Sequence, residues 1–122
     1  PYVAAAKRFA EKFSDTSKFG TLTTVIVGNE PFSLGEPGSV DVVLTFRNSH
    51  GWYAGNRQEE IYGAAFAVLK SGGTFGVVQH RAPEGGDAKA WAEKGYLPES
   101  VVIEAATKVG FVLDAKSEIN AN

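Results

Sequence analysis

The chain has 122 residues, of which 43% are hydrophobic and 21% charged, so it is long enough for one globular domain or a piece of one and too short for two. Twelve basic and fourteen acidic residues give a net charge of -2, which supplies no electrostatic reason to expect nucleic acid or an anionic membrane as a partner. The absence of cysteine excludes disulfides, thiolate metal sites and a cysteine nucleophile. The apolar runs have the length of strands and not of membrane spans.

The first third of the chain predicts one helix and two strands. Apolar residues recur at helical spacing near the start, which predicts an amphipathic helix over residues 2 to 13 that ends before Gly20. Leu22 to Val27 and Val40 to Phe46 are short apolar runs rich in β-branched residues, with glycine or proline on their flanks. Both runs are expected to be strands buried on two faces.

The remainder predicts two further helices and two further strands. Ile61 to Val68 has helical spacing, and the glycines of residues 70 to 73 are expected to supply its C-cap, before a strand over Thr74 to Gln79. Residues 82 to 97 show little periodicity, and we expect a polar, mobile loop there. Pro98 suits the first turn of a helix that Gly110 ends, and Phe111 to Ile119 alternates enough to be a fourth strand.

Apolar strands interleaved with amphipathic helices predict an α/β fold, with a mainly parallel sheet covered by helices on both faces. In such sheets ligands bind beyond the carboxyl ends of the strands, where the order of the strands reverses. The residues that follow the predicted strands are polar or titratable, whereas the strand interiors are apolar. They are Gly28, Asn29 and Glu30, then Arg47, Asn48, Ser49, His50 and Trp52, then His80 and Arg81, and finally, near the end of the fourth strand, Glu118 and Asn120.

Three segments, Ser39 to Thr45, Leu69 to Phe75 and Val109 to Leu113, resemble successive segments of the Rossmann-like class I S-adenosylmethionine-dependent methyltransferases. The second resembles the Leu-Lys-Pro-Gly-Gly turn of that family, with Ser71 in place of the proline. More narrowly, the chain resembles a bacterial group of methyltransferase-like proteins. That resemblance covers nearly the whole chain and lies in Leu44 to Asn48 with His50 and Trp52, in His80 and Arg81, in Gly95 to Glu99 and in Ser117 to Asn122.

The resemblance implies that residues 1–122 are the C-terminal part of one methyltransferase-like domain. Its four predicted strands would be strands three to six of a seven-stranded fold, with strands one, two and seven missing. The glycine-rich loop and the acidic residue that hold the cofactor in the family have no counterpart here. We therefore expect a natural polypeptide longer at both ends, and a sheet that needs the remainder of its own domain or another chain to be complete. We also expect the segment alone to be unstable and inactive.

The resemblance also implies a site for S-adenosylmethionine and a small-molecule substrate. Cofactor contacts are expected from Gly28, Asn29, Glu30, Phe46 and Arg47, with the Asn29 carbonyl accepting from the adenine amine. His50 and His80 are the candidates for a catalytic base and its orienting partner, and the alternative is that they only support loops. Substrate contacts are expected from Arg47, Asn48, Trp52, Arg81, Glu118 and Asn120.

Several of these residues have a second interpretation. Arg47 and Arg81 suit a carboxylate or phosphate, or an internal ion pair with Glu118 or Glu30. Trp52 either stacks on a flat ligand or forms the wall or lid of a pocket. The histidines and Glu118 lack the spacing of a local metal motif, so no metal site is expected.

The expected function is therefore methyl transfer to a small acceptor, which the arginines would suit if it is anionic. The alternative is a catalytically degenerate Rossmann-like binding protein without methyltransferase activity. A hydrolase is disfavoured because the chain lacks a Gly-x-Ser-x-Gly sequence. Relatives in the bacterial group commonly carry export signals, which implies the periplasm, whereas S-adenosylmethionine is made in the cytoplasm, so both locations stay open.

Overall fold

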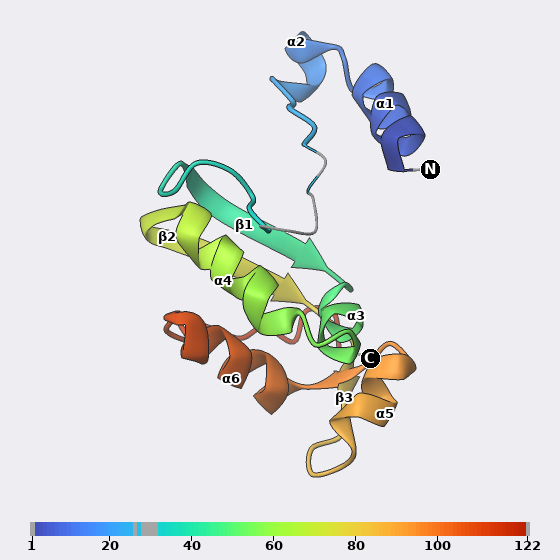
Figure 1. Cartoon of the computed structure of the whole chain (residues 1–122), viewed down its shortest axis with the longest axis vertical. Coiled ribbons are helices and arrows are strands. Elements are labelled where there is room, and N and C mark those ends of the chain that lie inside the picture. The colour runs from blue at the N-terminus through green and yellow to red at the C-terminus, as the bar shows by residue number, and fades with distance from the viewer. Residues whose placement is uncertain (1, 26, 28–31, 122) are drawn as a thin grey trace. The chain divides into compact units, whose positions relative to one another are not determined.

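A computed structural model describes residues 2–25, 27 and 32–121, and the chain divides into two compact units, residues 1–34 and 35–122 (Figure 1). The larger unit is mixed α/β and holds two small parallel sheets. The proposed cofactor residues Gly28, Asn29 and Glu30 lie outside the described residues.

The first unit begins with the predicted helix, α1 (Tyr2–Lys12). The short helix α2 (Thr16–Phe19) comes next. The Asp15 side chain caps the start of α2 by accepting a hydrogen bond from the backbone N–H of Ser17. Residues 22–25 and 27 have no regular secondary structure, so the strand predicted there is wrong. A β-branched run favours extended backbone, but a strand also needs a hydrogen-bonded neighbour, and the described residues supply none.

The second unit is built around two parallel strands, β1 (Val40–Phe46) and β2 (Leu69–Val78), which pair from Val42 opposite Thr74 to Phe46 opposite Val78. The connection between them carries α3 (Ser49–Ala54) and α4 (Gln58–Val68). Parallel strands need such a crossover, because the chain must return to the same end of the sheet. The predictions for β1 and α4 are confirmed.

The end of α4 differs from its prediction. Its C-cap residue is Leu69, in an extended conformation, and the last carbonyls of α4 accept the N–H groups of Gly38 and Ser39 at 3.0 and 2.9 Å. No glycine is needed as a cap because the chain passes directly from helix to strand. Residues 70–73 instead form an irregularity opposite Asp41, where Gly72 has a φ of 80°.

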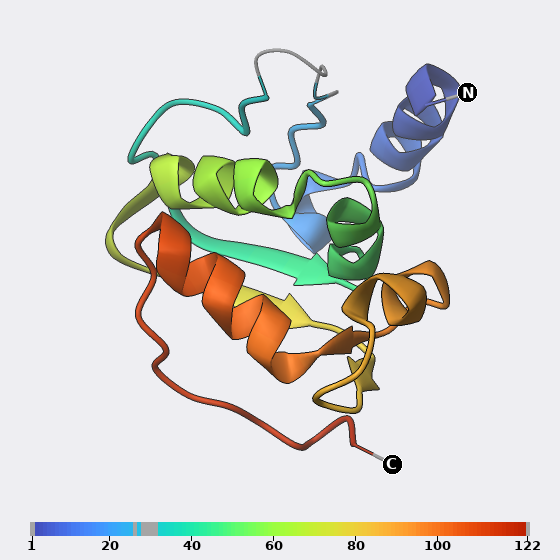
Figure 2. The ribbon, with the colours of Figure 1, turned by 60° about the horizontal axis from the view of Figure 1, so that its bottom comes forward.

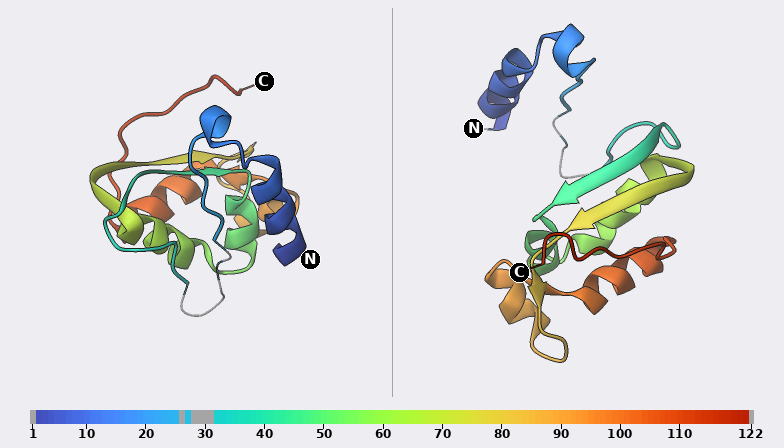
Figure 3. Two further views of the ribbon diagram at one scale, coloured as in Figure 1. Left: turned by 90° about the horizontal axis from the view of Figure 1, so that it is seen from above. Right: turned by 180° about the vertical axis from the view of Figure 1, so that it is seen from behind.

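Helices cover one face of the β1–β2 sheet. Helix α6 (Glu99–Val109) packs beside α4, and the Phe75 ring of β2 lies 5.0 Å from the rings of Tyr62 and Phe111. Seen from behind, β1 and β2 lie in front of α4 (Figure 3). The opposite face exposes the side chains of Val42, Leu44 and Phe46 by 52%, 60% and 59%. The prediction of helices on both faces therefore does not hold within this unit.

Residues 82–97 were predicted to be a loop, and that prediction is wrong. They contain α5 (Ala88–Glu93), whose first N–H groups are capped by the Asp87 carboxylate, and a short parallel pair, β3 (Arg81–Ala82) and β4 (Leu97–Pro98). Leu97 and Ala92 are buried. Helix α5 packs against α3, so these residues are buried by a distant part of the chain, which their own spacing does not reveal.

Helix α6 ends at Gly110, as predicted, with a φ of 121°. The strand predicted for Phe111 to Ile119 is wrong, because residues 111–118 have no regular secondary structure and pair with no strand of the described chain. Residues 111–121, here called the C-terminal strap, turn back along α6 toward its first turn, where Lys116 meets Glu99 at 2.7 Å (Figure 2).

Candidate small-molecule site at the carboxyl ends of β1 and β2

The chain turns sharply at the carboxyl end of β1. Arg47 has a φ of 60°, which is uncommon for a residue with a side chain, and its N–H donates to the Val78 carbonyl at 2.7 Å. Asn48 then starts α3, and its amide nitrogen donates to the Thr45 hydroxyl at 3.2 Å. The side chains of Arg47 and Asn48 are consequently exposed beside the end of the sheet.

The polar residues that follow the two strands meet through His50 and Gln79. His50 lies in the first turn of α3, and Gln79 comes directly after β2. The Gln79 Oε1 atom accepts the backbone N–H of His50 at 3.2 Å and lies 3.3 Å from the Nδ1 atom of its ring. The Gln79 Nε2 atom donates to the Gly95 carbonyl at 2.9 Å. Gln79 therefore joins the ends of both strands to the segment that follows α5.

A buried polar cluster fixes α3 against α4. The Ser49 and Tyr62 hydroxyls lie 2.7 Å apart, and Gln58 Nε2 donates to the Tyr62 hydroxyl at 3.3 Å. Burial raises the pKa of Tyr62, so the phenol stays neutral at physiological pH. The Trp52 ring lies edge-on to Tyr62, with 6.5 Å between the ring centroids. Trp52 thus packs against Tyr62, which links α3 to α4.

His80 lies apart from His50 in its contacts. Its exposed ring is tilted against Tyr96 at a centroid distance of 5.5 Å, and its carbonyl accepts the N–H of Leu97. Within the described residues no contact joins the two imidazole rings. The side chain next to His50 is Gln79, which sequence reasoning placed inside the strand and did not assign to the site. The signal was present, because Gln79 is a polar residue that ends an apolar run.

Arg81 is held by carboxylates. Its guanidinium donates two hydrogen bonds to Glu118, at 2.7 and 2.8 Å, and one to Glu99 at 3.2 Å. The hydrogen bond from Arg81 lowers the pKa of Glu118, and those from Lys116 and Arg81 lower the pKa of Glu99. The ion pair that the sequence offered as the alternative role of Arg81 is therefore present.

Two other residues predicted to belong to the site, Phe46 and Asn120, have side chains that make no hydrogen bond or ion pair with the described residues. Phe46 is exposed at the end of β1, and Asn120 is exposed in a turn near the end of the strap. The described residues contain no group of histidine and carboxylate side chains that could hold a metal ion. None of the helices in the described parts of the chain is long and apolar enough to cross a membrane.

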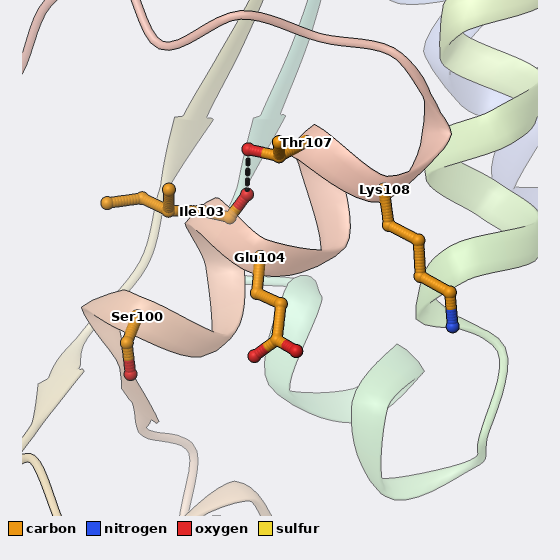
Figure 4. Close-up of a pocket in the computed structure, with 5 residues that line it drawn as sticks. All are labelled: Ser100, Ile103, Glu104, Thr107 and Lys108. Carbon is orange, nitrogen blue, oxygen red and sulfur yellow. Dashed lines mark hydrogen bonds between the residues drawn. The ribbon is translucent and has the colours of Figure 1, made fainter.

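An open depression elsewhere on the surface is formed by α6 alone (Figure 4). Its lining residues are Ser100, Ile103, Glu104, Thr107 and Lys108. Lys108 pairs with Glu59 at 2.7 Å, and the Thr107 hydroxyl donates to the Ile103 carbonyl. A ligand site usually gathers polar groups from several elements, so this depression is a weaker candidate than the strand ends.

Comparisons with protein-family models, curated proteins and solved structures found no match to this chain.

Proposed function

We propose that the carboxyl ends of β1 and β2 form part of a site for S-adenosylmethionine and a small methyl acceptor, in a Rossmann-like methyltransferase domain. The observation that carries the proposal is the contact between His50 and Gln79. It brings together the polar residues that follow two parallel strands joined by a helical crossover. Ligands of parallel α/β sheets bind at this end.

The pattern of formed and unformed strands supports the same assignment. In the proposed fold β1 and β2 would be strands four and five, which are neighbours, and they pair in parallel. Residues 22–27 and 111–119 would be strands three and six, whose neighbours have no counterpart in this chain. The described residues of these two segments do not form strands. An apolar segment that lacks its neighbouring strand has no backbone groups to pair with, so it does not form a strand.

The described residues fit part of the cofactor. Phe46 exposes an aromatic ring at the end of β1, which suits packing against adenine, and the exposed guanidinium of Arg47 suits a carboxylate. Gly28, Asn29 and Glu30, which the resemblance also assigns to the cofactor, lie outside the described residues. When bound, S-adenosylmethionine would supply the activated methyl group, so the protein's main work would be to position the acceptor and to move a proton.

The proposal assigns recognition of an anionic acceptor to Arg47, with Asn48 and Trp52 beside it. Arg47 makes no ion pair with any described residue, whereas an anion at Arg81 would have to displace Glu118 and Glu99. His50 would take the proton that the acceptor loses. His80, Arg81, Glu118 and Asn120 would lie at the margin of the site.

Calorimetric titration of the full-length protein with S-adenosylmethionine and S-adenosylhomocysteine tests this proposal. We expect micromolar binding, on the order of -8 kcal/mol, and about tenfold weaker binding after Asn29→Ala. His50→Ala should leave binding in place and slow methyl transfer by about 10²- to 10⁴-fold. Lys108→Ala, near the C-terminal end of α6, is the matched control and should change neither. A well-folded protein that binds neither compound would contradict the proposal.

A second candidate is a Rossmann-like binding protein that does not transfer methyl groups. The ion pair between Arg81 and Glu118 favours it, because two predicted substrate residues neutralise each other. The two candidates differ in the segment that would precede this chain in the parent gene. A glycine-rich turn after strand one there would favour the enzyme, and a turn filled with bulky residues would favour the binding protein.

A further inference from the structure

The orientation of the Gln79 side-chain amide is set by two main-chain groups. The backbone N–H of His50 can only donate, so the Gln79 atom 3.2 Å from it is the oxygen. The Gly95 carbonyl can only accept, so the atom 2.9 Å from it is the amide nitrogen. These two contacts agree, which leaves Gln79 Oε1 facing the His50 ring.

This orientation decides which ring nitrogen of neutral His50 carries the hydrogen. Gln79 Oε1 lies 3.3 Å from Nδ1 and can only accept, so a hydrogen bond there requires a hydrogen on Nδ1. The lone pair then resides on Nε2. Within the described part of the chain Nε2 has no hydrogen-bond partner, and the His50 side chain is half-buried. We propose that Gln79 is a positioning residue that holds His50 as its Nδ1–H tautomer and presents Nε2 as the free acceptor.

The use of that acceptor rests on the proposed function. A hydroxyl or amine held at the strand ends would donate its hydrogen bond to Nε2 and give up its proton to the same atom as the methyl group arrives. The ring would then carry hydrogens on both nitrogens, with Nδ1–H still donating to Gln79, and would release the Nε2 proton to solvent. A second group that orients the base in this way recurs in catalytic sites.

Nitrogen-15 NMR of the tag-free full-length protein tests the tautomer directly. The correlations between ring carbon-bound protons and ring nitrogens are assigned to His50 and His80 by substitution of each in turn. In the unaltered protein, at a pH where the rings are neutral, we expect His50 to show the Nδ1–H pattern. His80 stacks on Tyr96 without a bond to its ring nitrogens in the described residues, and it serves as the internal reference. An Nε2–H pattern for His50 would overturn the inference without any variant.

Two substitutions separate orientation of the ring from support of the loop. Gln79→Glu keeps an oxygen that accepts from Nδ1–H and loses the donations to the carbonyls of Gly95 and His80. Gln79→Met loses the hydrogen bonds of both amide atoms. We expect His50 to stay Nδ1–H in Gln79→Glu and to shift to the Nε2–H form, which prevails in free histidine, in Gln79→Met. The His80 ring should keep its tautomer in both variants, because Gln79 contacts the His80 carbonyl and not the ring nitrogens. An unchanged His50 tautomer in a folded Gln79→Met protein would also overturn the inference.

The same samples distinguish this inference from the proposed function. Titration with S-adenosylhomocysteine reports the cofactor site, whereas the ring nitrogen shifts report the contact between Gln79 and His50. An Nδ1–H tautomer in a protein that binds no S-adenosylhomocysteine would sustain the positioning role and refute the methyl-transfer proposal. Binding of S-adenosylhomocysteine together with an Nε2–H tautomer would refute the positioning role of Gln79 and support the methyl-transfer proposal.

Discussion

Arg81 and Glu118 lie 37 positions apart in the sequence, and their side chains form a two-pronged ion pair with donor–acceptor distances of 2.7 and 2.8 Å. Arg81 belongs to β3, and Glu118 lies near the end of the C-terminal strap. The strap forms no strand, and the side chains of Val112 and Ile119 are exposed. Charged side chains at its far end therefore hold the strap in place, together with the packing of Phe111 at its start.

Removal of the Arg81 side chain should release the end of the strap. We expect Arg81→Ala to speed hydrogen exchange at the amides of Ile119 and Ala121 several-fold, with no change in α4, because the ordering of residues 117–121 depends on Glu118. The control is Lys70→Ala, which breaks an exposed ion pair with Asp41 and leaves the strap untouched. Equal exchange at Ile119 in both variants would show that the ion pair does not order the strap.

The attachment of the strap should also depend on pH. The pKa values of Glu118 and Glu99 are lowered below 4.5 in the folded protein, so both carboxylates bind protons less readily there than in the unfolded chain. The stability that these two ion pairs give to the attached strap is complete above pH 4.5. It is lost as the pH falls through the lowered pKa values of the two carboxylates.

Amide chemical shifts of residues 117–121, followed from pH 7 to pH 2, measure this transition. They should stay constant near neutrality and change only in the acidic range. In Arg81→Ala the pH midpoint of this change in chemical shift should rise toward the ordinary pKa of glutamate. A step near neutral pH would show that another group controls the strap.

Gly110 is required at the end of α6 for two reasons. Its φ of 121° disfavours any other residue, and a Cβ atom there would lie 2.8 to 3.3 Å from three carbons of the Phe66 ring. Gly110→Ala should lower the free energy of unfolding by at least about 2 kcal/mol, the sum of backbone strain and overpacking. Gly85→Ala is the matched control, because Gly85 has a φ of 79° with open space around it. Chemical denaturation should show a clearly smaller loss, roughly 1 kcal/mol, for the control; equal losses would rule out the contact with Phe66.

The buried hydroxyl of Tyr62 should contribute to stability through its partners. Tyr62→Phe leaves Ser49 and Gln58 without their shared partner, and we expect a loss of about 1–3 kcal/mol in the free energy of unfolding. Tyr53→Phe removes a hydroxyl that makes no hydrogen bond with the described residues and should change it by less than about 0.5 kcal/mol. In the double variant with Ser49→Ala the loss should be smaller than the sum of the single losses. Additive losses would show that the two hydroxyls act independently.

The sequence by itself determined the elements whose pattern is local. Helices α1, α4 and α6 follow from apolar residues at helical spacing, and β1 follows from a bounded apolar run. The end of α6 at Gly110 follows from the conformation that glycine alone adopts readily. The sequence also placed polar residues after β1 and β2, because the change from apolar to polar at a strand end is visible without coordinates.

Only the tertiary structure decided which apolar runs became strands. Val40–Phe46 and residues 22–27 have the same apolar, β-branched character. Among the residues that the structure describes, only Val40–Phe46 has a parallel neighbour, β2, which begins 29 residues after Val40. A strand is stabilised by hydrogen bonds to another segment, so its own residues cannot settle the outcome. The contact of His50 with Gln79 and that of Arg81 with Glu118 are non-local in the same way. The sequence supplied the donors and acceptors, and the packing of distant segments decided which of them meet.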